Sequence, residues 1–266
     1  MSRLALTFNC QGATLAGTLD TAPGTAGLLL VNGGNEIRSG AFAGQARFAA
    51  QIARAGFPVF RFDRRGTGDS EGANRGFRHE ADDIAAALAA FRALAPQLGR
   101  VVGMGNCDAA SALMLAGGAR CDALVLSNPW TIDEAGVETG EEAGADVTPP
   151  ASAIRARYLA KLKNPREVAR LVSGEVDLRK LLRGIAKAAK PKPAPTSLAA
   201  EMRTGLETFD GPVRILLAEA DRTAQAFAEN WGDDPRIASC PRAGHAYVEP
   251  HARQWLRDQV LGALRG

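Results

Sequence analysis

The sequence predicts an α/β fold in which helices cover both faces of a mostly parallel sheet. Short apolar runs recur along the chain, and stretches with a helical pattern separate most of them. Strands that alternate with helices in this way are typical of parallel sheets. The chain has 266 residues, enough for a large core, and its apolar and charged fractions, 46% and 23%, are those of a globular protein.

The expected elements follow the apolar runs in chain order. We expect a pair of strands over 3–8 and 13–19, followed by buried strands over 27–31, 57–62, 101–104, 123–127, 213–218 and 236–240. Helical patterns cover 42–55, 80–94, 108–117, 224–231 and 251–264. Gly56 directly follows the first helix, as is typical of a helix C-terminus.

The alternation stops after Pro129 and resumes near residue 209. The stretch between is helix-prone and uneven in charge, because acidic residues gather over 133–146 and basic residues over 155–192. We therefore expect a core formed by 1–128 and 209–266, with a helical lid, 129–208, inserted into it. The end of this stretch, KAAKPKPAPTS, is typical of a flexible connector.

Composition excludes several classes of function. The net charge of +3 is too balanced to indicate nucleic acid as a partner. Four cysteines without CxxC pairs, together with three histidines, argue against a disulfide framework and against the usual zinc sites. No apolar run reaches the roughly 18–20 residues that a membrane span needs, and the N-terminus lacks the pattern of a signal peptide. We therefore expect a cytoplasmic protein.

The segment around Cys107 predicts a sharp turn from a strand into a helix. In G-x-S-x-G turns, the central residue is presented above the sheet, and its neighbours two positions away must be small. Gly105 and Ala109 meet this condition around Cys107. A thiol there would lie at a helix N-terminus, which favours the thiolate. Cys107 is therefore the candidate nucleophile.

Two other interpretations of this segment compete with a nucleophile. Free cysteines are often small buried hydrophobic residues, but that reading ignores the strand before Cys107 and the helix after it. Gly103 and Gly105 also begin like a dinucleotide-binding loop. Asp108 stands where the third glycine would be, and its charge would repel a pyrophosphate.

A nucleophile of this kind needs a base, and the base needs an acid that orients it. Asp221 and His245 each follow the end of a predicted strand, in the chain order nucleophile, acid, histidine. His79 and His251 lie near predicted helix starts, where surface or capping roles suffice. The rival acids do not follow a strand end as Asp221 does; they are Asp210, Asp233 and Asp234.

An attacked carbonyl also needs donors for its developing negative charge. The backbone N–H of Asp108 is one candidate, because it directly follows the nucleophile. The second donor should come from the loop after residue 31, where two glycines allow close approach of the backbone. Gly34 is the first choice and Asn35 the second, while a plain turn remains the alternative for this loop.

These motifs together resemble the α/β-hydrolase superfamily over nearly the whole chain. The loop RFDRRGTGDSEG after the strand at 57–62 looks like the loop after that family's fourth strand. The chain also resembles, more narrowly, the exosortase A system-associated hydrolases of type 1, which are linked to exopolysaccharide and protein-sorting loci. The matching stretches are Gly33-Gly34 with Arg38, Arg61-Phe-Asp-x-Arg-Gly, Gly105-x-Cys107-Asp108, Asn128-Pro129-Trp130 and Glu134-Ala135-Gly136.

The predicted reaction is acyl transfer through a thioacyl-enzyme. His245, oriented by Asp221, takes the proton of Cys107, and the thiolate attacks a carbonyl. The cysteine resembles that of dienelactone hydrolases, so small esters, lactones or thioesters are the expected substrates. The resemblance makes Arg38 a candidate substrate-binding residue. No metal or organic cofactor is expected.

Two other classes of function stay open. One is a catalytically weak scaffold on the same fold, since fold does not imply function. The other is a protein that associates weakly with an anionic surface through a short basic amphipathic helix. Its apolar residues would be Leu178, Leu181, Leu182 and Ile185. A lid helix that covers the pocket is the simpler explanation of that pattern.

Overall fold

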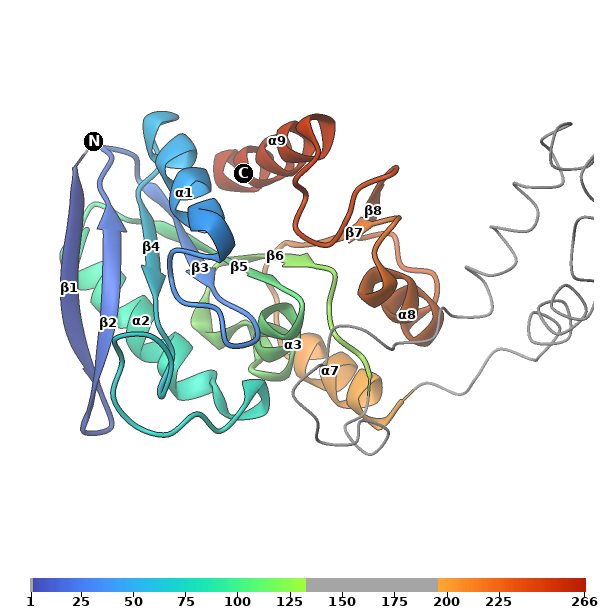
Figure 1. The fold of residues 1–266 in the computed structure, drawn as a ribbon, viewed down its shortest axis with the longest axis horizontal. Coiled ribbons are helices and arrows are strands. Elements are labelled where there is room, and N and C mark those ends of the chain that lie inside the picture. The colour runs from blue at the N-terminus through green and yellow to red at the C-terminus, as the bar shows by residue number, and fades with distance from the viewer. Residues whose placement is uncertain (1, 133–195) are drawn as a thin grey trace, which may run out of the picture.

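A computed structural model of the protein describes residues 2–132 and 196–266. An eight-stranded sheet forms its centre, in the order β1-β2-β4-β3-β5-β6-β7-β8 (Figure 1). The strands are β1 (Arg3–Cys10), β2 (Ala13–Asp20), β3 (Ala26–Val31), β4 (Val59–Phe62), β5 (Arg100–Asn106), β6 (Ala123–Ser127), β7 (Val213–Ala218) and β8 (Ile237–Cys240). β2 pairs antiparallel with β1 and β4, and all other pairs are parallel.

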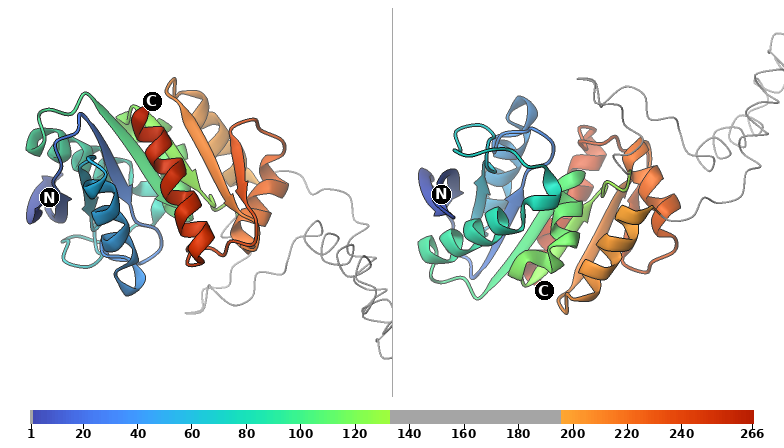
Figure 2. Two further views of the ribbon diagram at one scale, coloured as in Figure 1. Left: turned by 90° about the horizontal axis from the view of Figure 1, so that it is seen from above. Right: turned by 90° about the horizontal axis from the view of Figure 1, so that it is seen from below.

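Helices cover both faces of this sheet. The described helices are α1 (Gly44–Arg54), α2 (Ala81–Leu94), α3 (Asp108–Leu115), α7 (Ser197–Glu207), α8 (Arg222–Trp231) and α9 (Pro250–Arg265). α1 and α9 lie on one face, and α2, α3 and α7 lie on the other (Figure 2). The predicted α/β fold, with a mostly parallel sheet and helices on both faces, is therefore confirmed.

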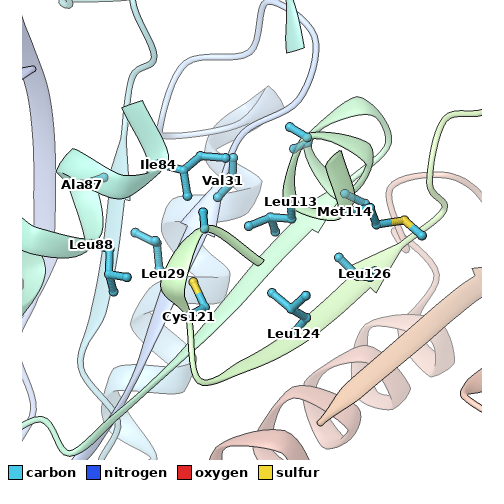
Figure 3. Packing of buried hydrophobic residues seen from close by; sticks show 14 of the residues in the cluster. Leu29, Val31, Ile84, Ala87, Leu88, Leu113, Met114, Cys121, Leu124 and Leu126 are labelled. Atoms are coloured by element: carbon cyan, nitrogen blue, oxygen red, sulfur yellow. The ribbon is translucent and has the colours of Figure 1, made fainter. Parts of the chain in front are cut away.

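Alternation along the strands divides the core between the two faces. In β3, Leu28 and Leu30 pack toward α1 and α9, whereas Leu29 and Val31 pack toward α2 and α3. Figure 3 shows the second set, in which Leu29 and Val31 meet Ile84 and Leu113. A strand buried on both faces has to be apolar throughout, which explains the continuous run GLLLV.

The bounds of several elements differ from the sequence prediction. Both strands of the first hairpin are longer than predicted, since antiparallel pairing continues to Cys10 and leaves only a tight turn at Gln11 and Gly12. The helix expected from residue 42 begins at Gly44, because Phe42 and Ala43 have positive φ angles of 49° and 57°. Positive φ is incompatible with a right-handed helix.

Helix α7 falls within the range that the sequence assigned to the lid, yet it packs against α3. Its apolar stripe is fully buried and joins the core on that face of the sheet; the residues are Leu198, Met202 and Leu206. Residues 197–207, which the prediction placed in the lid, thus pack with the core. Residues 133–195 of the proposed lid, which include the basic amphipathic stretch and Glu134-Ala135-Gly136, lie outside the described residues.

Candidate active site

Cys107 lies at a strained turn between β5 and α3. Its φ and ψ angles are 61° and −130°, a conformation that non-glycine residues adopt rarely and at an energetic cost. Its N–H donates to the carbonyl of Ser127 at 3.0 Å, and its carbonyl accepts from the N–H of Ala110 at 3.1 Å. These backbone hydrogen bonds on both sides of the residue hold the turn in place.

Gly105 explains why the turn can be so tight. A Cβ atom at this position would lie 2.5 Å from the carbonyl carbon of Ala109 and 2.6 Å from the nitrogen of Ala110. Real Cβ atoms do not approach backbone so closely, so only glycine fits where β5 passes α3. Ala109, the other small neighbour, is completely buried. The sequence pattern around Cys107 thus has the packing origin that was expected of it.

Asp221 and His245 meet next to this turn, although 24 positions separate them in the chain. Asp221 follows β7 and His245 follows β8, and their facing atoms, Oδ2 and Nδ1, are 2.9 Å apart. The hydrogen bond with Asp221, and then that with Cys107, raises the pKa of His245 well above its ordinary value. The imidazole is 40% exposed, so a substrate can reach it. The structure therefore brings the three predicted residues together.

One of the two expected oxyanion donors has a partner within the chain. The N–H of Gly34 lies beside the turn, but it donates to Oδ1 of Asp108 at 2.7 Å. That carboxylate is mostly buried, and burial raises its pKa despite hydrogen bonds from backbone N–H groups. Asp108 Oδ2 lies 3.9 Å from the guanidinium of Arg64, which also forms an ion pair with Glu80. The Gly34 N–H, one of the two predicted oxyanion donors, is thus engaged by a carboxylate of the chain itself.

Asn35 and Arg38 point to structural contacts rather than to Cys107. Asn35 Oδ1 accepts a hydrogen bond from Asn74 Nδ2 at 3.0 Å. The Arg38 guanidinium uses all three nitrogens within the protein, on Thr18, Asp63 and Asp69. This set of contacts ties the loop after β3 to the loop after β4. In this arrangement the Arg38 guanidinium is anchored by three side chains of the protein.

His251 and Asp234, which were not chosen as site residues, have contacts of their own. His251 Nε2 contacts the carbonyl of Pro241 at 2.9 Å. Asp234 forms an ion pair with Arg236 at 2.6 Å. Among the described residues, no three His, Cys, Asp or Glu side chains are grouped so that they could hold a metal ion. No helix in this part of the chain is long and apolar enough to cross a membrane.

Sequence reasoning missed two asparagines that complete the site. Asn106 lies between Gly105 and Cys107, with Nδ2 at 3.2 Å from Nε2 of His245. Asn128 directly follows β6, is fully buried and has a positive φ of 42°. Its position after a strand end was the available signal, because strand ends had also located Asp221 and His245.

The fold and this site define the class of the protein. The chain belongs to the alpha/beta hydrolase family, whose model matches residues 28–259. None of the curated proteins compared with the chain matches it.

Solved structures share the fold at low sequence identity. An esterase from Pyrococcus furiosus, Pf2001, is 13% identical, with a TM-score of 0.63 over 100% of this chain and 92% of its own. The hydrolase GrgF from a Penicillium species is 18% identical, with a TM-score of 0.62 over 100% and 99%. XC6422 from Xanthomonas campestris, described as a serine hydrolase without lid, is 17% identical, with a TM-score of 0.57 over 99% and 96%. At these identities the likeness concerns the fold alone.

Proposed function

We propose that the protein hydrolyses or transfers the acyl group of a small ester, lactone or thioester through a thioacyl-enzyme on Cys107. The observation that carries this proposal is the 2.9 Å contact between Asp221 and His245 beside the strained turn at Cys107. A nucleophile, a base and an orienting acid in this arrangement are the parts that acyl transfer needs. The esterase among the structural neighbours is consistent with this class of reaction.

The reaction has two halves. First, the Cys107 thiol gives its proton to Nε2 of His245, and the sulfur attacks the carbonyl carbon. The bond to the leaving alkoxide or thiolate breaks, and that group takes the proton from His245. Water then gives a proton to His245 and attacks the thioester, which releases the acid and restores the thiol. The Asp221 carboxylate accepts the hydrogen bond from the Nδ1–H of His245 in both halves.

The experiment is a panel of acyl esters, lactones and thioesters, with intact-protein mass spectrometry of each mixture. We expect a mass increase equal to the acyl group, mapped to Cys107, and no adduct in the Cys107→Ala variant. His245→Ala should slow turnover by about two orders of magnitude or more while the circular dichroism spectrum stays the same. Turnover near the wild-type rate in the His245→Ala variant would contradict the assignment.

One observation favours the second candidate, a catalytically weak scaffold on the same fold. The Gly34 N–H is engaged by Asp108, so a reacting carbonyl has to displace that carboxylate. Thiol labelling without turnover on any substrate would support the scaffold.

The resemblance to exosortase A system-associated hydrolases, with its link to exopolysaccharide, stays a prediction. So does weak association with an anionic surface, which salt-sensitive binding to anionic liposomes would test. A small-molecule acyl substrate remains the proposed partner.

A further inference from the structure

A chain of hydrogen bonds behind the site has only one possible direction. It begins at the backbone N–H of Ala218, which lies 2.8 Å from Oδ1 of Asn128. A backbone N–H can only donate, so this contact fixes which end of the Asn128 amide is oxygen. The Asn128 Nδ2 group then donates to Oδ1 of Asn106 at 3.0 Å and to the carbonyl of His245 at 3.1 Å.

The orientation of the Asn128 amide determines the orientation of the Asn106 amide. Because Oδ1 of Asn106 accepts from Asn128, its Nδ2 group is the end that faces Nε2 of His245, at 3.2 Å. An amide Nδ2 can only donate, so Nε2 has to be the acceptor. The remaining imidazole proton then lies on Nδ1, where Oδ2 of Asp221 accepts it.

We propose that Asn106 is a positioning residue that selects the proton state of His245, favouring the neutral imidazole with its lone pair on Nε2. This is the form that can take a proton from Cys107. Asn128, held by Ala218, sets the orientation of Asn106. The inference deepens the proposed function. The proton state of His245 can be measured independently of that function, whereas an effect of Asn106 on turnover rests on it.

Opposing influences meet at this imidazole. The titratable groups that face it are Asp221, at Nδ1, and Cys107, and both favour the protonated ring. A second proton on Nε2 would point at the hydrogens of Asn106 Nδ2, so Asn106 favours the neutral ring. Burial of the imidazole acts in the same direction as Asn106. Asn106 therefore limits formation of an imidazolium–thiolate pair before a substrate arrives.

The test is a nitrogen-15 NMR titration of the imidazoles, which reports the proton state without any substrate. The chain has three histidines, so loss of one signal in His245→Ala assigns the resonance. In Asn106→Leu, which removes the donor at similar size, we expect the pKa of His245 to rise by about one unit. Asn106→Asp, which replaces the donor by a carboxylate oxygen, should raise it further.

A second pair of variants tests transmission from Asn128. Asn128→Asp keeps an acceptor for Ala218 but presents an oxygen to Asn106, so the Asn106 amide should turn and the pKa of His245 should rise. Part of that rise in pKa comes from the negative charge added at Asn128. The double variant Asn128→Asp with Asn106→Leu measures this part alone, because no amide at position 106 can turn. If orientation is transmitted, the shift caused by Asn128→Asp becomes smaller in the Asn106→Leu background.

Tyr247→Phe is the matched control. It removes a hydroxyl 3.4 Å from the same Asn128 oxygen but leaves both Nδ2 bonds in place, so the His245 titration should not move. An unchanged pKa and tautomer in Asn106→Leu would overturn the inference, even if esters are hydrolysed through Cys107. Shifted titrations without turnover of any substrate would instead contradict the proposed function and leave the inference standing.

Discussion

Cys107 differs from the other three cysteines in its surroundings. Burial raises the pKa of the thiols of Cys10 and Cys240, and it raises that of Cys121 to about 12. Cys107 is only half-buried and lies beside His245. The thiolate is the reactive form of cysteine, so access and surroundings both favour Cys107.

We therefore expect limited iodoacetamide treatment at pH 7 to alkylate Cys107 first, by a margin of at least about tenfold. Peptide mapping by mass spectrometry measures the order of labelling. In urea the four thiols should react at similar rates, which is the control for peptide recovery. Labelling of Cys10 or Cys240 before Cys107 would contradict the assignment of the nucleophile.

Asp108 is the residue whose removal should increase activity. Asp108→Ala frees the Gly34 N–H, and one oxyanion donor is worth about two to three orders of magnitude in kcat. In the wild type a reacting carbonyl can still displace the Asp108 carboxylate from the Gly34 N–H. We therefore expect a smaller gain, of about tenfold in kcat, measured with an ester of the panel. The kcat of Asp108→Asn, which keeps a hydrogen-bond acceptor but lacks the charge, should lie between those of the wild type and Asp108→Ala. Lower turnover in Asp108→Ala would show that the carboxylate assists catalysis.

The pH dependence of this gain follows from the pKa of Asp108. Burial raises that pKa, so the carboxylate takes up its proton at a higher pH than an exposed aspartate would. A neutral carboxyl is a weaker acceptor for Gly34 and is displaced more easily. The ratio of Asp108→Ala to wild-type turnover should therefore be largest at neutral pH and should fall toward one in acid. A ratio that is constant from pH 4 to 8 would be evidence against this contact.

At the scale of elements, the packing of β5 against α3 determines where Cys107 is presented. Gly105→Ala should lower the free energy of unfolding by about 2 kcal/mol or more, because the added Cβ would overlap backbone atoms of α3. Turnover should fall with it, since the turn at Cys107 has to shift. Urea unfolding followed by fluorescence gives the stability.

Gly99→Ala is the matched control for Gly105→Ala. It adds the same methyl group just before β5, where a Cβ would meet nothing within 4 Å. Its stability and turnover should stay close to wild type. Equal effects of the two substitutions would show that loss of backbone freedom, and not the close approach of α3, explains the glycine.

At the scale of the whole molecule, the inserted segment begins and ends at one place on the core. The hydroxyl of Thr196 donates to the carbonyl of Thr131 at 2.8 Å, so the two ends of the insertion are held together. Thr196 is also the N-cap of α7, since its Oγ1 accepts from the N–H of Ala199. The core therefore has a natural point at which the chain could be rejoined.

Replacement of 133–195 by a short glycine–serine linker should leave a cooperatively unfolding core, because both ends already lie side by side. Substrate preference across the ester panel should change. Adding Thr196→Ala to this deletion should cost about 1 kcal/mol, because α7 then lacks its cap. Thermal unfolding followed by circular dichroism measures the cooperativity of the first deletion and the loss of stability caused by Thr196→Ala. Non-cooperative unfolding of the first deletion would show that the segment belongs to the core.

Local patterns in the sequence were enough to predict the order of the strands along the chain and the places of Cys107, Asp221 and His245 after strand ends. These depend on local signals: apolar runs mark buried strands, and the carboxyl ends of parallel strands meet at one edge of the sheet. A residue that directly follows such a run is therefore placed near the others before any contact is known.

The contacts between distant segments could be learned only from the folded structure. It placed β4 between β2 and β3, joined α7 to the core, engaged Gly34 with Asp108 and aligned Asn128 with Asn106. Each of these is a pairing of groups many residues apart, and the same polar side chain could have found other partners in another packing. A single backbone donor, the N–H of Ala218, determines the direction of the hydrogen bonds in this network. No local sequence pattern predicts that contact, because Ala218 and Asn128 are 90 positions apart.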